Sequence, residues 1–333
     1  MDRRTFLKLS GAVAAQAALW SPQVGRAEAE SASAHGLGNP FLQEGRWFKA
    51  AFHVHTTTSD GDVDVPTRLN QYRKLGYQVV AITDHWKTND LSAFAEEDFL
   101  PIVGLEMHPQ TGTGAPAHHF VVLNVPHPFE LDRKLAAQAM IDQVLSVGGK
   151  VIYAHPYWTT HSLNEMLEVA GYCALEVFNG GCHVENDTGY GSVHWDQVLN
   201  KGRLIGGIAT DDVHNSKLIN IGWTMIKAPA LNAAAIMEAI EKGCYYASAG
   251  PTIEDCRIED GVIRVITSPV RRITFRCNGV GGGHVVQAKP GETLTSAEWK
   301  FAGSRRRYQW IRVEVADEMD NRAWTNPFVI PTA

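Results

Sequence analysis

The chain has 333 residues, of which 44% are hydrophobic and 20% are charged, and this balance is usual for a globular protein. The length is enough for one large α/β domain and a smaller second domain. The formal net charge of −6 and the pI near 6.2 give no reason to expect nucleic acid or an anionic membrane as a partner.

The first thirty residues are expected to be a targeting segment rather than part of the fold. Arg3 and Arg4 precede a mildly apolar stretch that ends near Leu19. This pattern is typical of a Tat-type signal peptide, so residues 1–30 are predicted to direct the protein to the periplasm or out of the cell. Residues 31–45 are predicted to be a flexible lead-in. The mature chain has no run of about eighteen apolar residues, so we expect no membrane span in it.

After residue 45, short apolar runs alternate with segments of helical periodicity. This alternation indicates strand–helix–strand units and a parallel sheet, open or closed. Strands are predicted at 47–52, 79–83, 99–105, 120–123, 151–154, 174–178, 204–209 and 221–226. Helices are predicted at 66–75, 131–147, 163–169, 195–200 and 232–242, and the Gly-rich stretch 179–192 is predicted to be a loop.

The pattern changes at Gly250-Pro251. Three later segments, 257–266, 272–277 and 308–316, alternate apolar and polar residues, which indicates antiparallel β-structure. We therefore predict one domain over 46–250 and a small β-sandwich-like domain over 251–333. The five cysteines are an odd number, so at least one thiol is unpaired within the chain, and a disulfide such as Cys256–Cys277 would be compatible with export.

His53 and His55 stand two residues apart behind an apolar run. In a strand, residues i and i+2 point to the same face, so both imidazoles can converge on one ion. The Asp60-Gly61 turn can carry a carboxylate back to the same place. Two solvated surface histidines would explain the HxH pattern alone equally well, but further candidate ligands follow along the chain.

Polar side chains of metal-binding type stand at or just after the ends of six predicted strands: His55, His85, Glu106, His155, Asn179 and Asp212. The C-terminal rim of a parallel barrel is where active sites are built, so we expect these side chains to meet. Nitrogen and carboxylate donors without thiolate suit Zn, Mn or Fe.

These motifs resemble those of the PHP superfamily, which is named for its polymerase and histidinol phosphatase members. The matching segments are HxHTxxSDG at 53–61, TDH at 83–85, a Glu near the end of an apolar strand, a His before the next strand, AHP at 154–156 and DxH at 212–214. The resemblance covers roughly residues 48–225 and implies a distorted (β/α)7 barrel with two or three divalent metal ions. The implied ligands are His53, His55, Asp60, His85, Glu106, His119, His155, Asp212 and His214.

In this resemblance Glu106 bridges two metals, and Asp60 and His85 complete neighbouring sites, so catalysis is expected to depend on these three residues. His118 is an alternative to His119 as a ligand. Two further side chains, Asp211 and Asn179, are expected to orient a ligand or a water. The remaining histidines match no motif and are expected to be surface or core residues: His108, His127, His161, His183 and His194.

The resemblance implies a metal-dependent hydrolase in which a metal-bridging hydroxide attacks a small-molecule substrate. Most of the superfamily favours a phosphoesterase, either a phosphatase or a phosphodiesterase, acting on an anionic ester. A second hypothesis is a carbamate, ester or amide hydrolase, because the chain is also similar to the CehA/McbA-like branch in its export signal, its HHFVVL segment at 118–123 and its extra β region. A third is a metal-binding protein whose saturated cluster has no catalytic role. The oligomeric state is not indicated.

Overall fold

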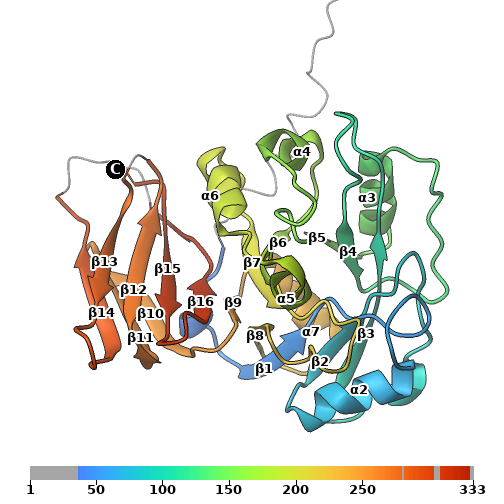
Figure 1. The fold of residues 1–333 in the computed structure, drawn as a ribbon, viewed down its shortest axis with the longest axis horizontal. Coiled ribbons are helices and arrows are strands. Elements are labelled where there is room, and N and C mark those ends of the chain that lie inside the picture. Colours follow the sequence, from blue (N-terminus) through green and yellow to red (C-terminus); the bar gives the residue numbers. More distant parts are fainter. Residues whose placement is uncertain (1–36, 280, 304–307, 331–333) are drawn as a thin grey trace, which may run out of the picture. The chain divides into compact units, whose positions relative to one another are not determined.

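The apolar runs that follow residue 45 form the strands of a barrel. The computed structural model describes residues 37–279, 281–303 and 308–330, and Figure 1 shows how their elements are arranged. The predicted signal peptide and the first part of the predicted lead-in lie outside these residues. A short 3-10 helix, η1 (Pro40–Leu42), precedes the first strand. None of the described helices combines the length and the apolarity that a membrane crossing requires.

Two parallel runs of strands form most of the barrel wall. The first run is β1 (Arg46–Ala51), β2 (Val79–Ile82) and β3 (Leu100–Met107), and the second is β5 (Lys150–Tyr153), β6 (Ala174–Asn179) and β7 (Gly206–Thr210). All residues of β2, β6 and β7 are buried, as expected for parallel strands that are covered on both faces.

The strand β4 (Phe120–Leu123) lies between these two runs and is antiparallel to both β3 and β5. The expectation of a wholly parallel sheet is therefore wrong at this strand, and it is wrong again at β8 (Trp223–Ala228), which is antiparallel to β1. At β4 the reason lies in the connection, because residues 108–119 contain no helix, whereas a parallel return usually needs a helical crossover. The reversal places the start of β4 at the rim where the neighbouring strands end.

The barrel closes where the segments after β1 and β7 meet. Val54 and Val213 form a parallel bridge, and the backbone N–H of Asp212 donates to the carbonyl of His53 at 3.1 Å. The strand β8 (Trp223–Ala228) is antiparallel to β1, and its Thr224 hydroxyl bonds the carbonyl of Ala209 in β7 at 2.9 Å. Closure thus puts the HxH segment directly beside the DxH segment.

Five helices occupy regions where helices were predicted: α2 (Val65–Lys74), α3 (Ala137–Ser146), α4 (Leu163–Glu168), α6 (Ser192–Asn200) and α7 (Ala233–Glu241). Local signals set their ends. Asp64 caps α2 by accepting from the N–H of Thr67 at 3.0 Å. Ser162 and Glu165 form a capping box at the start of α4. A 3-10 helix, η2 (Ser92–Phe94), lies between β2 and β3.

The helix α5 (Gly180–Asn186) stands where a Gly-rich loop was expected. Asn179 starts it, because its side chain accepts from the N–H of Cys182 at 2.9 Å. Glycine is required at 181, where a Cβ would lie only 2.8 Å from the carbonyl oxygen of Asp212. The glycines therefore allow a helix to approach the DxH segment closely, rather than marking a loop.

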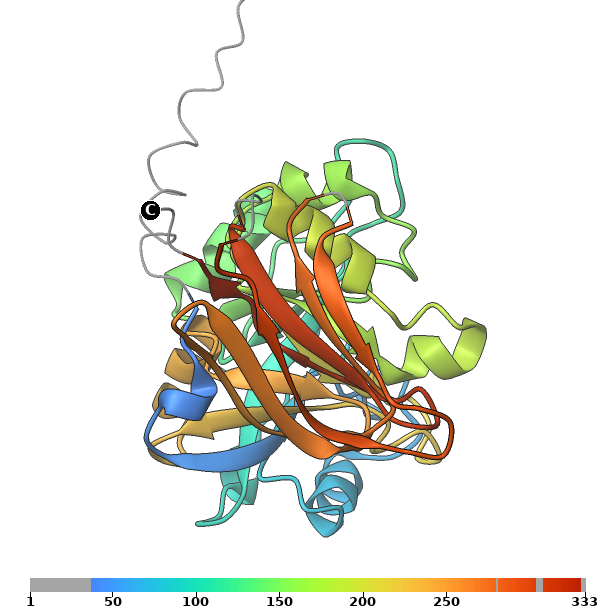
Figure 2. The same cartoon turned by 90° about the vertical axis from the view of Figure 1, so that its left-hand side faces the viewer.

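The C-terminal region, which faces the viewer in Figure 2, folds as two antiparallel sheets. The two sheets share an apolar core. One sheet consists of β10 (Ile253–Glu259), β11 (Val262–Val270) and β14 (Leu294–Lys300). The other contains β12 (Arg272–Cys277), β13 (Gly283–Gln287), β15 (Trp310–Ala316) and β16 (Arg322–Thr325), and the short β17 (Phe328–Val329) pairs with β15. The predicted fold class, a distorted α/β barrel followed by a small antiparallel β domain, is confirmed by the arrangement of the strands.

One predicted strand, 257–266, is in fact a hairpin. Asp260 and Gly261 both have positive φ, 49° and 72°, and they turn the chain from β10 into β11. An Asp-Gly pair is a strong signal for this kind of two-residue turn. Cys256, in β10, is a buried free thiol, so the structure contains no Cys256–Cys277 disulfide.

The strand β9 (Tyr245–Ser248) connects the two regions. It pairs with β8 of the barrel on one side and with β16 of the β domain on the other. Trp310 and Trp324 of the β domain also pack in the same buried core as Trp195 of α6. The barrel sheet therefore continues into the β domain without a break.

Candidate metal centre

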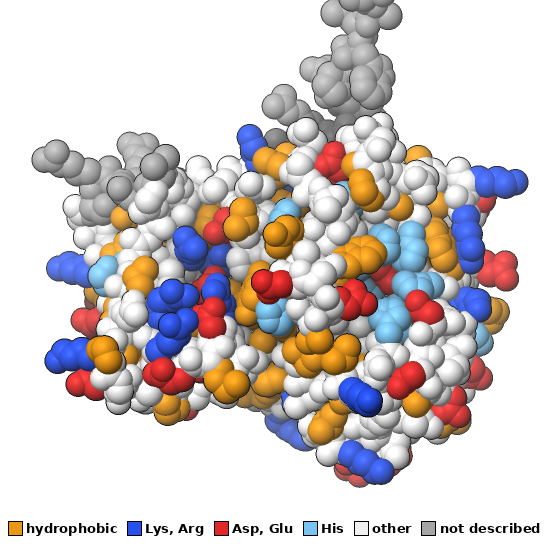
Figure 3. Space-filling model, in the orientation of Figure 1, with side chains coloured by type: hydrophobic (Ala, Val, Ile, Leu, Met, Phe, Trp, Pro, Cys, Tyr) orange, Lys and Arg blue, Asp and Glu red, His pale blue; other side chains and the backbone are white. Residues whose placement is uncertain are grey.

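The nine predicted ligands meet at one rim of the barrel. Figure 3 shows histidine and acidic side chains gathered on one face of the molecule. Most of them follow strands that end at this rim, and Glu106 lies within the last part of β3. His119 is different because it precedes β4, and the reversed direction of β4 carries it to the same place. The expected convergence is therefore present in the structure.

Glu106 lies at the middle of the cluster and is almost completely buried. Its Oε1 faces three imidazole nitrogens: His119 Nδ1 at 2.8 Å, His155 Nε2 at 3.4 Å and His108 Nε2 at 3.4 Å. Its Oε2 faces three others: His85 Nδ1 at 2.9 Å, His53 Nε2 at 3.2 Å and His55 Nε2 at 3.5 Å. One carboxylate thus contacts two separate groups of histidines, as expected for a bridging ligand.

Two further carboxylates complete the cluster. Asp212 Oδ1 lies 3.1 Å from His55 Nε2 and 3.2 Å from His53 Nε2. Asp60 is half exposed and lies at the outer edge, 3.2 Å from His85 Nε2 and 3.4 Å from His214 Nε2. The carboxylates therefore extend the cluster from the buried HxH pair to the surface.

The donor atoms fit divalent metal ions. The Nε2 atoms of His53 and His55 and the Oδ1 atom of Asp212 are buried and lack a hydrogen-bond partner, although they lie close together. Buried polar atoms without partners are costly, and a shared cation would satisfy all three at once. Among the residues that the structure describes, four groups of donors have all their ligand atoms within 4.8 Å of one another: His53/His55/Asp212, His53/Glu106/His155, His55/Asp60/His85/His214 and His85/Glu106/His108.

The titratable side chains in the cluster shift one another's pKa values. Burial disfavours the charged form of Glu106, but His53 and hydrogen bonds from neighbouring histidines hold the pKa of this carboxyl well below its usual range. Burial also opposes protonation of His53, yet Asp212, Glu176 and Glu106 together raise the pKa of this imidazole well above its usual value. The carboxylates therefore attract positive charge to this place, and a metal ion would compete with protons for it.

Behind the cluster lies Glu176, which was not among the predicted site residues. Its Oε1 lies 2.7 Å from His53 Nδ1, and its Oε2 accepts from the backbone N–H of His155 at 2.9 Å. Asn179 donates to Glu176 Oε2 at 2.8 Å and to Asp212 Oδ2 at 3.0 Å, so it orients two carboxylates, as expected. The signal that could have revealed Glu176 is an acidic residue within the otherwise apolar run of β6.

Two other aspartates organise the loops around the site. Asp84 accepts from the backbone N–H and hydroxyl groups of both Thr56 and Ser59, which fixes the turn that carries Asp60. Asp211 was expected to orient a ligand, but its described partners are the Tyr72 hydroxyl and the backbone N–H groups of residues 220–222. Burial raises the pKa of Asp211. Its role is to hold the loop that follows the DxH segment.

The structure separates the two candidates His118 and His119. His119 reaches Glu106, whereas His118 is fully buried and lies 3.0 Å from the Tyr153 hydroxyl through its Nδ1. The same hydroxyl lies 2.7 Å from His161 Nδ1. His118 therefore belongs to a buried network beside the cluster, and His119 is the one of the two whose ring lies within the cluster.

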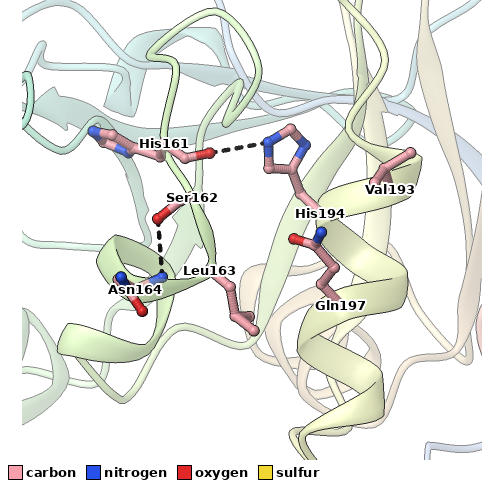
Figure 4. A pocket seen from close by; sticks show the side chains of 7 residues that line it. All are labelled: His161, Ser162, Leu163, Asn164, Val193, His194 and Gln197. Carbon is pink, nitrogen blue, oxygen red and sulfur yellow. Dashed lines mark hydrogen bonds between the residues drawn. The ribbon is translucent and has the colours of Figure 1, made fainter.

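The unmatched histidines have different surroundings. His108 lies against Glu106, which differs from the expectation of a surface or core residue. His161 and His194 line a second hollow of about 490 Å³, where the His161 carbonyl lies 3.1 Å from His194 Nε2 (Figure 4). This contact ties the loop after β5, which carries His155, to α6. His127 lies against Thr88 and His183 against Asp187, both away from the cluster.

A hollow of about 520 Å³ opens over the cluster. Its wall outside the cluster is formed by Trp158, Gly181, Cys182, Glu185, Asn215 and Leu218. The ring of Trp158 packs against the rings of His119 and His155 and remains 40% exposed. None of the described residues that line this hollow is Lys or Arg. A substrate would therefore meet the cluster on one side and a largely uncharged wall with one exposed acid, Glu185, on the other.

Comparisons with known proteins give similar folds at low sequence identity. No family model and no curated protein matches the chain. A similar solved structure is a two-domain protein of Bacteroides vulgatus containing a predicted PHP-like metal-dependent phosphoesterase, with 15% identity, coverage of 89% of this chain and 98% of that chain, and a TM-score of 0.49. Another is PsfC from Pseudomonas syringae, with 13% identity, coverage of 58% of this chain and 87% of that chain, and a TM-score of 0.42. A third is an amidohydrolase from Chromobacterium violaceum, with 13% identity, coverage of 50% of this chain and 87% of that chain, and a TM-score of 0.38.

The fold and the rim together define a barrel protein with a buried cluster of histidines and carboxylates that fits divalent metal ions. The motif segments that carry the resemblance to the PHP superfamily meet at this one rim. The narrower similarity to the CehA/McbA-like branch stays a prediction. The distances within the cluster support the function proposed below.

Proposed function

We propose that the protein is a metal-dependent hydrolase that cleaves phosphoesters. The observation that carries this proposal is the position of Glu106, which contacts two groups of histidines through its two oxygens at the floor of an open hollow. Divalent cations, when bound, supply a nucleophilic water at neutral pH and stabilise the negative charge that develops on the substrate. The open hollow argues against a saturated cluster without catalysis, because a substrate can reach the rim.

The groups of donors indicate how the residues would share the ions. His53, His55 and Asp212 would hold one ion together with Glu106 Oε2. His119 and His155 would hold a second together with Glu106 Oε1. Asp60, His85 and His214 would hold a third at the outer edge. This division agrees with the expected number of two or three ions. Because the donors are imidazole nitrogens and carboxylate oxygens, Zn, Mn and Fe remain the candidate metals.

The residues behind the cluster prepare the ligands. Glu176 accepts a hydrogen bond from His53 Nδ1, which leaves the lone pair of His53 Nε2 free to face the cluster. His214 is oriented in the same way, because its Nδ1 lies 3.1 Å from the carbonyl oxygen of Asp212 and its Nε2 faces Asp60. The chain thus selects the imidazole tautomers that metal binding needs.

A second candidate function is hydrolysis of a carbamate, ester or amide, and the wall of the hollow favours it. Phosphate groups are commonly bound by Arg or Lys, and the described wall residues include neither. The exposed face of Trp158 would instead suit an apolar or aromatic group. A phosphodiester with one negative charge fits this wall better than a phosphomonoester with two.

The test is a substrate comparison on one metal-loaded sample. We expect turnover of bis-p-nitrophenyl phosphate to exceed that of p-nitrophenyl phosphate, and a chelator should abolish both activities. Faster turnover of p-nitrophenyl esters or 1-naphthyl carbamates than of either phosphate would establish the second candidate. A sample with full metal content and no turnover of any of these compounds would contradict both.

We also propose that the protein acts outside the cytoplasm, which is supported by the twin arginine at residues 3 and 4. A periplasmic location would give the enzyme access to esters taken up from the surroundings.

A further inference from the structure

His108 lies within the cluster although no motif contains it. It stands two residues after Glu106, just beyond the end of β3, and its side chain returns to the side of the Glu106 carboxylate. Its Nε2 lies 3.4 Å from Glu106 Oε1, the same distance as that of His155 Nε2. This nitrogen is buried and has no hydrogen-bond partner. It therefore has the same unsatisfied character as the nitrogens of the HxH pair.

Neighbouring rings hold His108 in this position. It stacks on His119 with ring centroids 3.9 Å apart and an interplanar angle of 19°. The rings of His85 and Trp86 pack edge-on against it at 4.6 and 5.7 Å. An imidazole that is already fixed loses little conformational freedom when it binds a ligand. The packing therefore preorganises the nitrogen that faces Glu106.

We propose that His108 is a further metal ligand, which binds through Nε2 beside Glu106 Oε1. Two donors about 2.1 Å from a tetrahedrally coordinated ion are about 3.4 Å apart, which is the separation of His108 Nε2 from Glu106 Oε1. The ligand atoms of His85, Glu106 and His108 all lie within 4.8 Å of one another. The proposal rests on the metal-dependent function proposed above and adds an imidazole to the donors beside Glu106 Oε1.

An added imidazole has a consequence for the choice of metal. Nitrogen donors suit Zn, Fe and Co, whereas Mg prefers oxygen donors and water. The site beside Glu106 Oε1 would therefore bind Zn²⁺ or Co²⁺ in preference to Mg²⁺.

The first test is metal titration of the chelator-treated, folded protein with Co²⁺. We expect His108→Asn to weaken the binding of one ion at least about tenfold, because even the loss of an outer hydrogen-bond partner of a ligand typically costs about 10–100-fold. His127→Asn is the matched control, since His127 is exposed and lies against Thr88 away from the cluster. This control should bind all ions with wild-type affinity.

The second test looks for a new signal rather than a loss of metal affinity, so it remains informative if His108→Asn fails to fold. In His108→Cys the new thiolate should bind Co²⁺ and produce a sulfur-to-cobalt charge-transfer absorption that wild type and His127→Cys lack. The assignment of His108 alone would be overturned if His108→Asn bound Co²⁺ with wild-type affinity, or if Co²⁺-loaded His108→Cys lacked this absorption. Absence of metal binding by the wild-type protein would overturn the proposed function as well.

Discussion

Replacing Glu176 with Gln removes one negative charge from behind His53 while keeping the size of the side chain. The carboxylate is fully buried and accepts from three donors: His53 Nδ1, the His155 backbone N–H and the Asn179 side chain. A Gln side chain has only one acceptor oxygen, so it can replace either Glu176 Oε1 or Glu176 Oε2. In the better orientation the amide oxygen keeps the two partners of Oε2 and places its NH₂ group against His53.

The expected cost has two parts. One buried donor without an acceptor lowers the free energy of unfolding by about 1–3 kcal/mol. Loss of the carboxylate that orients His53 weakens metal binding by about 10–100-fold, which equals about 1.4–2.8 kcal/mol. Both effects are measurable on the same variant, the first by denaturant unfolding of the metal-free protein and the second by competitive metal titration.

Glu165→Gln is a suitable control, because Glu165 is also buried but belongs to the capping box of α4 and accepts from Ser162. This variant should lose stability and keep wild-type metal affinity. If Glu176→Gln binds metal within about twofold of wild type, or no more weakly than Glu165→Gln, then Glu176 does not orient His53 in the way described.

Other expectations concern the cluster and the export signal. Glu106→Gln should lose at least one metal ion per chain and most of the turnover, because the Glu106 carboxylate contacts both groups of histidines. Elemental analysis showing full metal content would refute the proposed bridging role. Metal affinity should rise from about pH 6 to about pH 8, because protons must leave the imidazole nitrogens before metal binds. The neighbouring carboxylates raise the pKa values of His53, His85 and His155, which makes these protons harder to remove. A metal affinity that does not change over this pH range would contradict this expectation. Replacing both Arg3 and Arg4 with Lys should leave the precursor in the cytoplasm, and unchanged export in cell fractionation would show that the segment is not read as a Tat signal.

Much of the cluster could be predicted because its candidate ligands occupy short motifs at the ends of apolar strands. His53, His55, Asp212 and His214 are close to one another only because the barrel closes, yet the HxH and DxH patterns identify them without knowledge of that closure. The motif spacing could not show that β4 is reversed, since strand direction depends on the connection rather than on the strand's own residues.

The site residues that were not predicted lie outside the matched motifs. Glu176 sits in an apolar strand, and its importance comes from contacts with His53 and His155, which lie 123 and 21 residues away along the chain. His108 matches no motif, and only the packing of its ring against His119 and His85 brings it to the cluster. The helix α5 was missed because glycines usually favour loops, whereas here Gly181 permits a close approach to Asp212.

The strand β9 has a consequence for how the protein unfolds. Its hydrogen bonds are shared between β8 and β16, so neither neighbour can separate without exposing the backbone groups of a buried strand. Because Trp310 and Trp324 also fill the core beneath α6, opening of the C-terminal sheets would leave a large void beside Trp195. We therefore expect a calorimetric scan to show a single cooperative transition in which the metal cluster and the distant C-terminal strands melt together, so that a destabilising substitution such as Trp324→Ala lowers the temperature at which metal is released.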